Sequence, residues 1–138
     1  MDIYSKSNRS KIMSKISGNE TKPEIMVRKY LFSHGFRFLK NDKRYPGKPD
    51  IVLPKHRTIV FIHGCFWHGH DCKAGKLPET NTDFWRKKIK DNIERDQRNQ
   101  DNLSNLGWNV IVVWQCELRN LISKEKRLQS LIKEIRKL

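Results

Sequence analysis

The segment from residue 63 to residue 72 concentrates side chains that could bind a metal. It reads His-Gly-Cys-Phe-Trp-His-Gly-His-Asp-Cys, which combines histidines, cysteines and two large aromatic residues. Thiolate and imidazole are the ligands that tetrahedral zinc prefers in proteins. Cys116 lies far downstream, so a site that includes it must join two distant strands. The pattern predicts a zinc site that holds the neighbouring aromatic side chains in place.

The best ligand set for this zinc consists of Cys65, His70, Cys72 and Cys116. A closed site of four protein ligands is structural, and its binding energy contributes directly to folding. On the residues alone, His68 or His63 could take the place of His70. The alternative interpretation is that the cysteines are buried core residues and the histidines lie on the surface.

The carboxylates suggest a second, catalytic cation. Asp50 follows Pro49 and begins an apolar strand. Hard cations prefer carboxylate oxygens, and Mg²⁺ keeps several waters that can serve phosphate chemistry. Glu24 and Asp96, on two expected helices, could approach the same place. For each of the three, the alternative is a solvated or salt-bridged surface acid.

His63 strengthens the case for Asp50. It ends the strand that should pair with the Asp50 strand, so the two side chains could share one edge of the sheet. An imidazole near magnesium can deprotonate a water that attacks a phosphodiester, because its pKa is near the operating pH.

Three aromatic residues stand beside these polar side chains: Phe66, Trp67 and Trp85. Exposed aromatic rings could stack on bases or insert between base pairs. The alternative is ordinary packing over the zinc site. Trp108 and Trp114, in contrast, are expected in the core.

Turn signals and apolar periodicity define the elements that must position these residues. Thr21, Pro23 and Glu24 are typical of a helix start, and Gly35 is a natural stop. The last helix has the clearest apolar face, comprising Leu128, Leu131, Ile132, Ile135 and Leu138. Strands are expected over residues 36–39, 50–53, 58–62 and 108–115, and a long helix over residues 82–106. The second and third strands should form a β-hairpin, within one α/β domain that has a mixed sheet.

Composition points to a polyanionic partner. The 138 residues contain 29 Lys and Arg against 15 Asp and Glu, a formal charge of +14, which is typical of nucleic-acid binding. A basic structural protein is the alternative. No apolar run could span a membrane, no secretory signal is evident, and three cysteines argue against a disulfide framework. Residues 1–20 are expected to form a basic arm or short helix, and residues 21–138 the catalytic domain.

Five stretches of the chain, in order, resemble the very short patch repair DNA mismatch endonucleases. They are Lys-Pro-Asp50-Ile-Val, Ile-His63-Gly-Cys65-Phe-Trp-His68-Gly-His70-x-Cys72, Phe-Trp85-x-x-Lys, Asn-x-Glu-Arg-Asp96 and Val-Val-Trp-x-Cys116. The match runs from about residue 8 to residue 119. The resemblance implies a restriction-endonuclease-like fold with one structural zinc. It also implies a Mg²⁺-dependent nick 5′ to the thymine of a T:G mismatch left by deamination of 5-methylcytosine.

The resemblance also implies roles for individual residues. Asp50 would be the main Mg²⁺ ligand, and His63 the general base or its organiser. His68 would contact the phosphate or the leaving group. Glu24 and Asp96 would bind metal-bound waters or orient His63. Zinc would be held by Cys65, His70, Cys72 and Cys116, and the wedge beside the mismatch would be Phe66, Trp67 and Trp85.

The sequence departs from the wider restriction-enzyme pattern at two positions. That pattern ends in an acidic residue and a lysine on the second strand, where this chain has Ile62 and Gly64. Ile62 could then offer only its main-chain carbonyl to magnesium. The best-known relatives carry threonine at this position, so the loss of a hydroxyl could alter metal affinity. Asp50 remains the sole certain carboxylate ligand, which leaves room for one ion or two.

The implied partners are double-stranded DNA with a T:G mismatch, mismatch-repair proteins and a repair polymerase, with no membrane. We expect a cytoplasmic monomer associated with the bacterial nucleoid. Two rival functions stay open at this point. One is a non-catalytic, zinc-stabilised nucleic-acid-binding module, and the other is a restriction-type nuclease of the same fold that cuts matched DNA.

Overall fold

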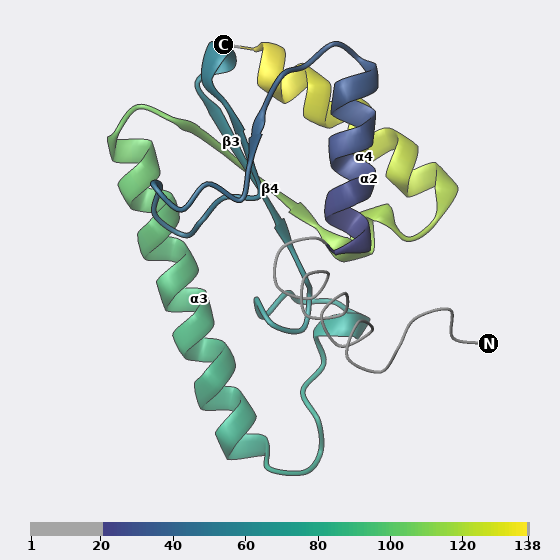
Figure 1. Cartoon of the computed structure of the whole chain (residues 1–138). Helices are drawn as coiled ribbons and strands as arrows, with labels where there is room; N and C mark the ends of the chain where they lie inside the picture. The colour runs from purple at the N-terminus through teal and green to yellow at the C-terminus, as the bar shows by residue number, and fades with distance from the viewer. Residues whose placement is uncertain (1–20, 138) are drawn as a thin grey trace, which may run out of the picture.

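The computed structural model describes residues 21–137, which form one four-stranded sheet and three α-helices (Figure 1). The strands are β1 (Leu39–Lys40), β2 (Ile51–Leu53), β3 (Thr58–His63) and β4 (Asn109–Trp114), in that order across the sheet. The first three pair antiparallel, and β4 lies parallel to β3. The prediction of an α/β domain with a mixed sheet is therefore confirmed. The arm expected over residues 1–20 lies outside the described residues.

The helices cover both faces of the sheet. Helices α2 (Lys22–Ser33) and α4 (Leu121–Arg136) pack together on one face, and α3 (Thr82–Asn105) lies on the other side (Figure 1). The larger core joins Val27 and Leu31 of α2 to the sheet and to α4. The predicted apolar face of α4 is buried, with Leu138 outside the described residues. A smaller core under α3 joins Leu103 to β2 and β3.

The two central strands are buried at every position, which explains their dense Val and Ile content. They form the predicted hairpin around a short 3₁₀ helix, η1 (Pro54–His56). Arg57 closes this turn in the left-handed region, at φ 47°. Thr58 is fully buried, and its hydroxyl is satisfied because it donates to the carbonyl of His56 at 3.0 Å. The hairpin therefore holds residue 50 and residue 63 on adjacent strands.

Two expectations about the remaining elements were wrong in detail. The strand expected over residues 36–39 is β1, at Leu39–Lys40. Phe36 still belongs to the helix end, because its amide donates to the carbonyl of Leu31 after the left-handed Gly35. Trp114 is half-buried at the end of β4 rather than in the core, and it stacks on His70. Trp108 is also half-buried and packs against the smaller core.

The parallel pairing of β3 and β4 determines where the polar residues meet. His63 and Trp114 are partners in the register, so both strands end at the same edge of the sheet. A loop over residues 64–81 leaves β3 there and contains a second 3₁₀ helix, η2 (Lys73–Gly75). A third, η3 (Gln115–Leu118), follows β4 at the same edge. Within residues 21–137, every helix is too short or too polar to cross a membrane.

Candidate active site and metal centre

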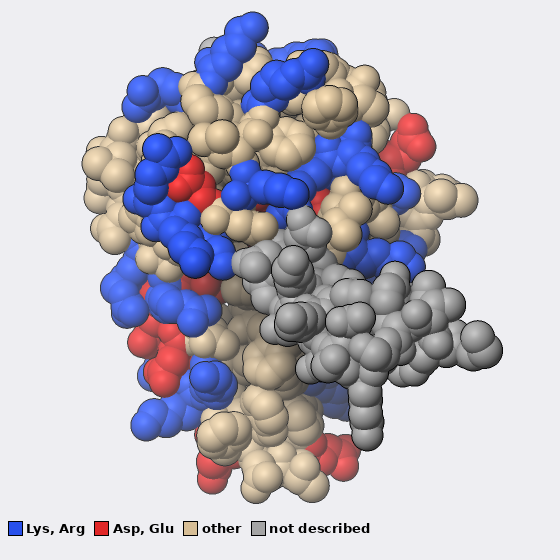
Figure 2. All heavy atoms as spheres, viewed as in Figure 1, with Lys and Arg blue, Asp and Glu red and all other residues tan. Residues whose placement is uncertain are grey.

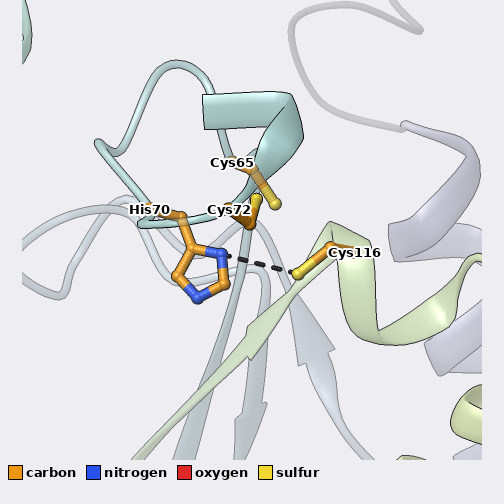
Figure 3. A group of neighbouring side chains, drawn as sticks. All are labelled: Cys65, His70, Cys72 and Cys116. Carbon is orange, nitrogen blue, oxygen red and sulfur yellow. Dashed lines mark hydrogen bonds between the residues drawn. The ribbon is translucent and has the colours of Figure 1, made fainter. Parts of the chain in front are cut away.

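Three cysteines and one histidine converge at the shared edge of β3 and β4. Cys65 follows β3, His70 and Cys72 lie in the loop, and Cys116 stands in η3 directly after β4. Their side chains point toward one another (Figure 3), and one ligand atom from each lies within 4.8 Å of the others. The structure thus brings His70 to the cysteines, whereas His63 and His68 lie together elsewhere.

The donor set fits a zinc ion. In a tetrahedral site with Zn–S bonds of about 2.3 Å, neighbouring ligands are roughly 3.8 Å apart. His70 Nδ1 and Cys116 Sγ are 3.4 Å apart, close to that spacing. Burial, followed by the hydrogen bonds and charges of Cys65 and Cys72, raises the pKa of Cys116 to about 12. Three crowded thiols can therefore ionise together only if a cation compensates their charge.

The surrounding backbone and rings hold this cluster in place. The amide of His70 donates to the carbonyl of Cys65, and the amide of Cys72 to the carbonyl of His70, both at 2.9 Å. The His70 ring stacks on Trp114 with centroids 4.1 Å apart. Glu117, which sequence reasoning missed, accepts a 2.7 Å hydrogen bond from the amide of Trp114 and thereby closes the turn that presents Cys116. Its position three residues after a strand end was the available signal.

Gly75 is required for the fold of the metal loop. A Cβ at this position would lie 1.9 Å from the carbonyl oxygen of His70, and backbone cannot move away cheaply. We expect Gly75→Ala to lower the zinc content per chain and the thermal unfolding midpoint, because it displaces a ligand-bearing segment. Metal analysis and thermal unfolding check this, with Gly35→Ala as the control. At Gly35 a Cβ meets nothing within 4 Å, so that variant suffers only from its left-handed φ of 86°.

A polar pocket of about 410 Å³ lies beside the metal centre and contains the predicted catalytic residues. Asp50 precedes β2, and its Oδ2 accepts a 2.6 Å hydrogen bond from the amide of Ile62 on β3. The Ile62 side chain is buried in the larger core, so only its main chain offers polar atoms to the pocket. Asp50 and His63 line this same pocket, as expected for residues at one edge of a hairpin.

Asp50 and Glu24 form a carboxyl pair. Glu24 comes from the first turn of α2 and is also ion-paired with Arg28, at 3.1 Å between Oε2 and Nη2. Burial, and then the charge of Glu24, raise the pKa of Asp50 to about 7. Burial also raises the pKa of Glu24, although Arg28 opposes the shift. Two buried carboxylates that repel each other form a site where a hard cation would be favourable, so these residues fit Mg²⁺.

Two imidazoles, those of His63 and His68, line the same pocket. His68 Nδ1 and Asp96 Oδ2 are 2.5 Å apart, which joins the metal loop to α3. His63 stacks on His68 with centroids 3.8 Å apart and planes 4° from parallel. Asp96 therefore orients His68, rather than His63 as one expectation had it. One ligand atom from each of His63, His68 and Asp96 lies within 4.8 Å of the others, so this group could hold a metal ion as well as transfer a proton.

The electrostatics divide these groups into different roles. Burial, and then the charge of His68, lower the pKa of His63 to about 4, so its ring is neutral at pH 7. Burial alone would raise the pKa of Asp96, but the hydrogen bond and charge of His68 outweigh it and lower that pKa. Asp96 is therefore an anion that holds the His68 ring in place through their contact. The His63 ring, which is neutral, can accept a proton. The His68 ring, which is held by Asp96, can supply one.

An aromatic cluster, formed by Phe66, Trp67, Phe84 and Trp85, projects beside the metal centre. Neighbouring rings meet edge to face, with centroids 5.1 Å apart for Phe66 and Trp67 and 5.4 Å for Phe66 and Trp85. Trp67 is 52% exposed, so packing over the zinc site does not bury it. Phe84 is 62% exposed and packs on Trp85 at 5.2 Å. Sequence reasoning missed Phe84, although it directly precedes Trp85 at the start of α3.

Basic and amide side chains complete the pocket. Lys48 comes from the connector before β2, and Arg95 and Asn99 come from α3. Lys and Arg also cover more of the face seen in Figure 2 than Asp and Glu do. A basic surface around a carboxylate pocket can bind a polyanion while leaving its phosphates accessible to a cation. Sequence reasoning gave the net charge but not these three residues, because lysine and arginine occur throughout the chain.

Comparison with known proteins gives consistent results. The family model described as DNA mismatch endonuclease Vsr matches residues 1–74. The type II nicking enzyme V.NmeAIP of Neisseria meningitidis is 57% identical over 135 residues, which cover 98% of this chain and 96% of that protein. V.XorIIP of Xanthomonas oryzae pv. oryzae, another type II nicking enzyme, is 46% identical over 95% of this chain and 96% of its own length. DNA mismatch endonuclease Vsr of Escherichia coli strain K12 is 43% identical over 86% of this chain and 76% of its own length.

These similarities, together with a metal-type centre beside an acidic pocket, define the chain as a DNA endonuclease. Within that class it belongs to the DNA mismatch endonuclease Vsr family. The resemblance found in the sequence is therefore confirmed. The rival interpretation as a non-catalytic nucleic-acid-binding module is set aside.

Proposed function

We propose that this endonuclease nicks one DNA strand 5′ to the thymine of a T:G mismatch produced by deamination of 5-methylcytosine. One observation carries the proposal: a carboxyl pair and a histidine–aspartate pair line one pocket, beside an exposed aromatic cluster. The domain of residues 21–138 would have a restriction-endonuclease-like fold. Its site would use Mg²⁺ for catalysis and Zn²⁺ for structure, and it would act as a monomer in the cytoplasm.

Each residue has a defined task in this mechanism. Asp50 and the main-chain carbonyl of Ile62 would hold magnesium, and Glu24 would bind its waters. When bound, the ion supplies a polarised water and neutralises charge on the phosphate. His63, neutral at pH 7, accepts the proton of the attacking water. His68 donates to the leaving oxygen or to a phosphate oxygen, and Asp96 keeps its ring oriented.

The mismatch itself would be recognised by deformation rather than by base-edge contacts alone. Phe66, Trp67 and Trp85 would insert beside the T:G pair, and Phe84 would support Trp85 from behind. A mismatched pair costs less to unstack than a matched pair, so insertion discriminates between them. Phosphate contacts from the basic surface would add affinity that falls as salt rises. Mismatch-repair proteins and a repair polymerase would act on the nicked product.

The direct test compares end-labelled duplexes that differ at one position. We expect the T strand of a T:G duplex to be nicked in Mg²⁺, and the matched T:A and C:G duplexes to stay intact. Without Mg²⁺ no nick should form. Equal cutting of matched DNA would instead favour a second candidate, a site-specific nicking enzyme that needs no mismatch. The observation that favours this second candidate is that the Neisseria and Xanthomonas relatives are both named type II nicking enzymes.

The histidine–aspartate pair gives a sharper test of the mechanism. We expect Asp96→Asn to lower the nicking rate by about 10²-fold, because an amide is a poor replacement for the carboxylate that orients the His68 ring and can hold the wrong tautomer. Asp91→Asn, an exposed carboxylate on the same helix, is the matched control. Binding to the T:G duplex should be unchanged in both variants. A full rate in Asp96→Asn would exclude the role given to His68.

The aromatic cluster should control selectivity rather than chemistry. We expect Trp67→Ala to weaken binding to a T:G duplex by roughly tenfold, since stacking of one base on an aromatic ring contributes about 1–3 kcal/mol. Binding to matched duplex should change little, because phosphate contacts dominate it. Fluorescence anisotropy with both duplexes measures the ratio. An equal loss on both would show that Trp67 contributes general affinity and no discrimination.

A further inference from the structure

A groove on the far side of α2 has no task in cleavage. This α2–β1 groove has a volume of about 490 Å³ and is lined by Arg28, Lys29, Phe32, Ser33, Arg37, Phe38 and Lys40. It lies between the second half of α2, the segment after it, and β1. It shares none of these residues with the catalytic pocket, and the aromatic cluster lies on other elements. The α2–β1 groove is therefore distinct from the catalytic pocket, and Arg28 connects the two through its ion pair with Glu24.

The floor of the groove is apolar and open. Phe32 is 60% exposed. Phe38 is half-buried and packs against the larger core, which fixes the floor to the rest of the molecule. A large apolar side chain placed against Phe32 would remove both rings from water, at a gain of about 25 cal/mol for each Å² buried. Such an anchor residue is typical of a protein segment that binds in a groove.

The rim of the groove is cationic. Lys29 and Arg37 are both exposed, the Arg37 guanidinium lies 4.7 Å from the centre of the Phe32 ring, and none of the lining residues is acidic. The ligand should therefore carry carboxylates around its apolar anchor. A second copy of this chain is a poor match, because each copy has a net charge of +14. Duplex DNA is also a poor match, because its convex phosphate surface needs no apolar hollow.

We propose that the α2–β1 groove docks an acidic segment of a partner protein, with one large apolar side chain seated on Phe32. The carboxylates of the segment pair with Lys29 and Arg37 at the rim. Because the groove is apart from the catalytic pocket, the partner could bind while the enzyme holds DNA. This inference concerns recruitment and stands even if the proposed mismatch specificity fails.

The test uses a fluorescein-labelled synthetic peptide with a central Leu-Phe pair flanked by Asp and Glu. A companion peptide carries Ser-Ser in place of the pair and controls for non-specific attraction to a basic protein. Anisotropy titrations with the full chain should show tighter binding of the Leu-Phe peptide. Phe32→Ala should weaken that binding roughly tenfold, as expected for an aromatic hot spot, and reduce it to the level of the companion peptide. Arg37→Gln should also weaken binding of the Leu-Phe peptide. Its affinity should then fall less steeply as the salt concentration rises.

Matched controls separate the groove from the rest of the surface. Phe84→Ala removes a phenylalanine of nearly equal exposure, 62%, and Arg119→Gln removes an exposed arginine after β4. Both should bind the Leu-Phe peptide normally, and Phe32→Ala should nick DNA at the full rate. The proposal is overturned if Phe32→Ala binds the Leu-Phe peptide as tightly as the parent does. It is also overturned if the Leu-Phe and Ser-Ser peptides bind equally tightly. Weaker duplex binding by Phe32→Ala would make the groove a DNA surface, and a change in oligomeric state on sedimentation would make it a self-interface.

Discussion

Asp50→Asn should lower the nicking rate by about 10³-fold or more and leave the fold intact. Removing a ligand that holds a catalytic cation forfeits several kcal/mol of transition-state stabilisation, at 1.36 kcal/mol for each tenfold change. Asparagine keeps an oxygen that can accept the 2.6 Å hydrogen bond from the amide of Ile62. Measured rates on a T:G duplex in Mg²⁺ test the loss, and duplex binding should be largely retained.

The same substitution should raise stability in the absence of metal, although it lowers the nicking rate. The pKa of Asp50 is raised to about 7 by burial and by Glu24, so its ionised form opposes folding increasingly as pH rises above the unfolded value of about 3.9. A neutral amide removes this cost. We therefore expect the metal-free variant to unfold at a higher temperature than the metal-free parent at pH 7, and at a similar temperature at pH 4.

Asp101→Asn is the control, because Asp101 is an exposed carboxylate on α3 that contacts only Gln97 among the hydrogen bonds of the described residues. It should change neither rate nor stability. A variant of Asp50 that loses duplex binding as completely as nicking would contradict the assignment of this residue to catalysis.

Cys116→Ser should cost the chain its zinc and much of its stability. Structural zinc contributes about 10–16 kcal/mol of apparent binding energy at pH 7, and a serine hydroxyl is a poor replacement for a thiolate. Among the described side chains of the loop over residues 64–81, Cys65 is the one that joins the buried core. The loop thus depends on the metal for its fold. We expect a fall of about 10 °C or more in the unfolding midpoint.

Elemental analysis of purified protein gives the zinc count, and thermal unfolding gives the midpoint. Gln115→Ala is a suitable control, because residue 115 precedes the ligand in η3 and supplies no metal-binding atom to the cluster. It should retain one zinc per chain. A Cys116→Ser protein that folds normally without zinc would remove Cys116 from the ligand set.

Local patterns in the sequence were sufficient for most of the fold. Continuous Val and Ile runs predicted β2, β3 and β4, and the spacing of Leu128, Leu131, Ile132 and Ile135 predicted the buried face of α4. These predictions succeeded because burial periodicity depends only on backbone geometry. The strand near residue 38 was misplaced, because the helix termination at Gly35 extends through a hydrogen bond of Phe36 that no periodicity encodes.

The candidate site was foreseeable in its residue types but not in its pairings. The density of Cys and His indicated a metal centre with His70 in the best ligand set, but His68 or His63 stayed possible replacements, and only the folded loop places His70 beside Cys116. Similarly, Asp96 was expected near His63, and its hydrogen bond goes to His68. Phe84 and Glu117 were missed, although Phe84 directly precedes Trp85 and Glu117 stands three residues after the end of β4.

The sequence by itself determined the chemistry that is possible: thiols and imidazoles for zinc, carboxylates for magnesium, and excess positive charge for DNA. It did so because ligand preference and net charge are properties of residue types. Only the tertiary structure decided which of these groups act together. Parallel pairing of β3 with β4 puts residues 63 and 114 side by side, so two segments separated by more than a third of the chain end at one edge of the sheet. Long-range pairing of this kind depends on the summed packing of both sheet faces, which no short stretch of sequence contains.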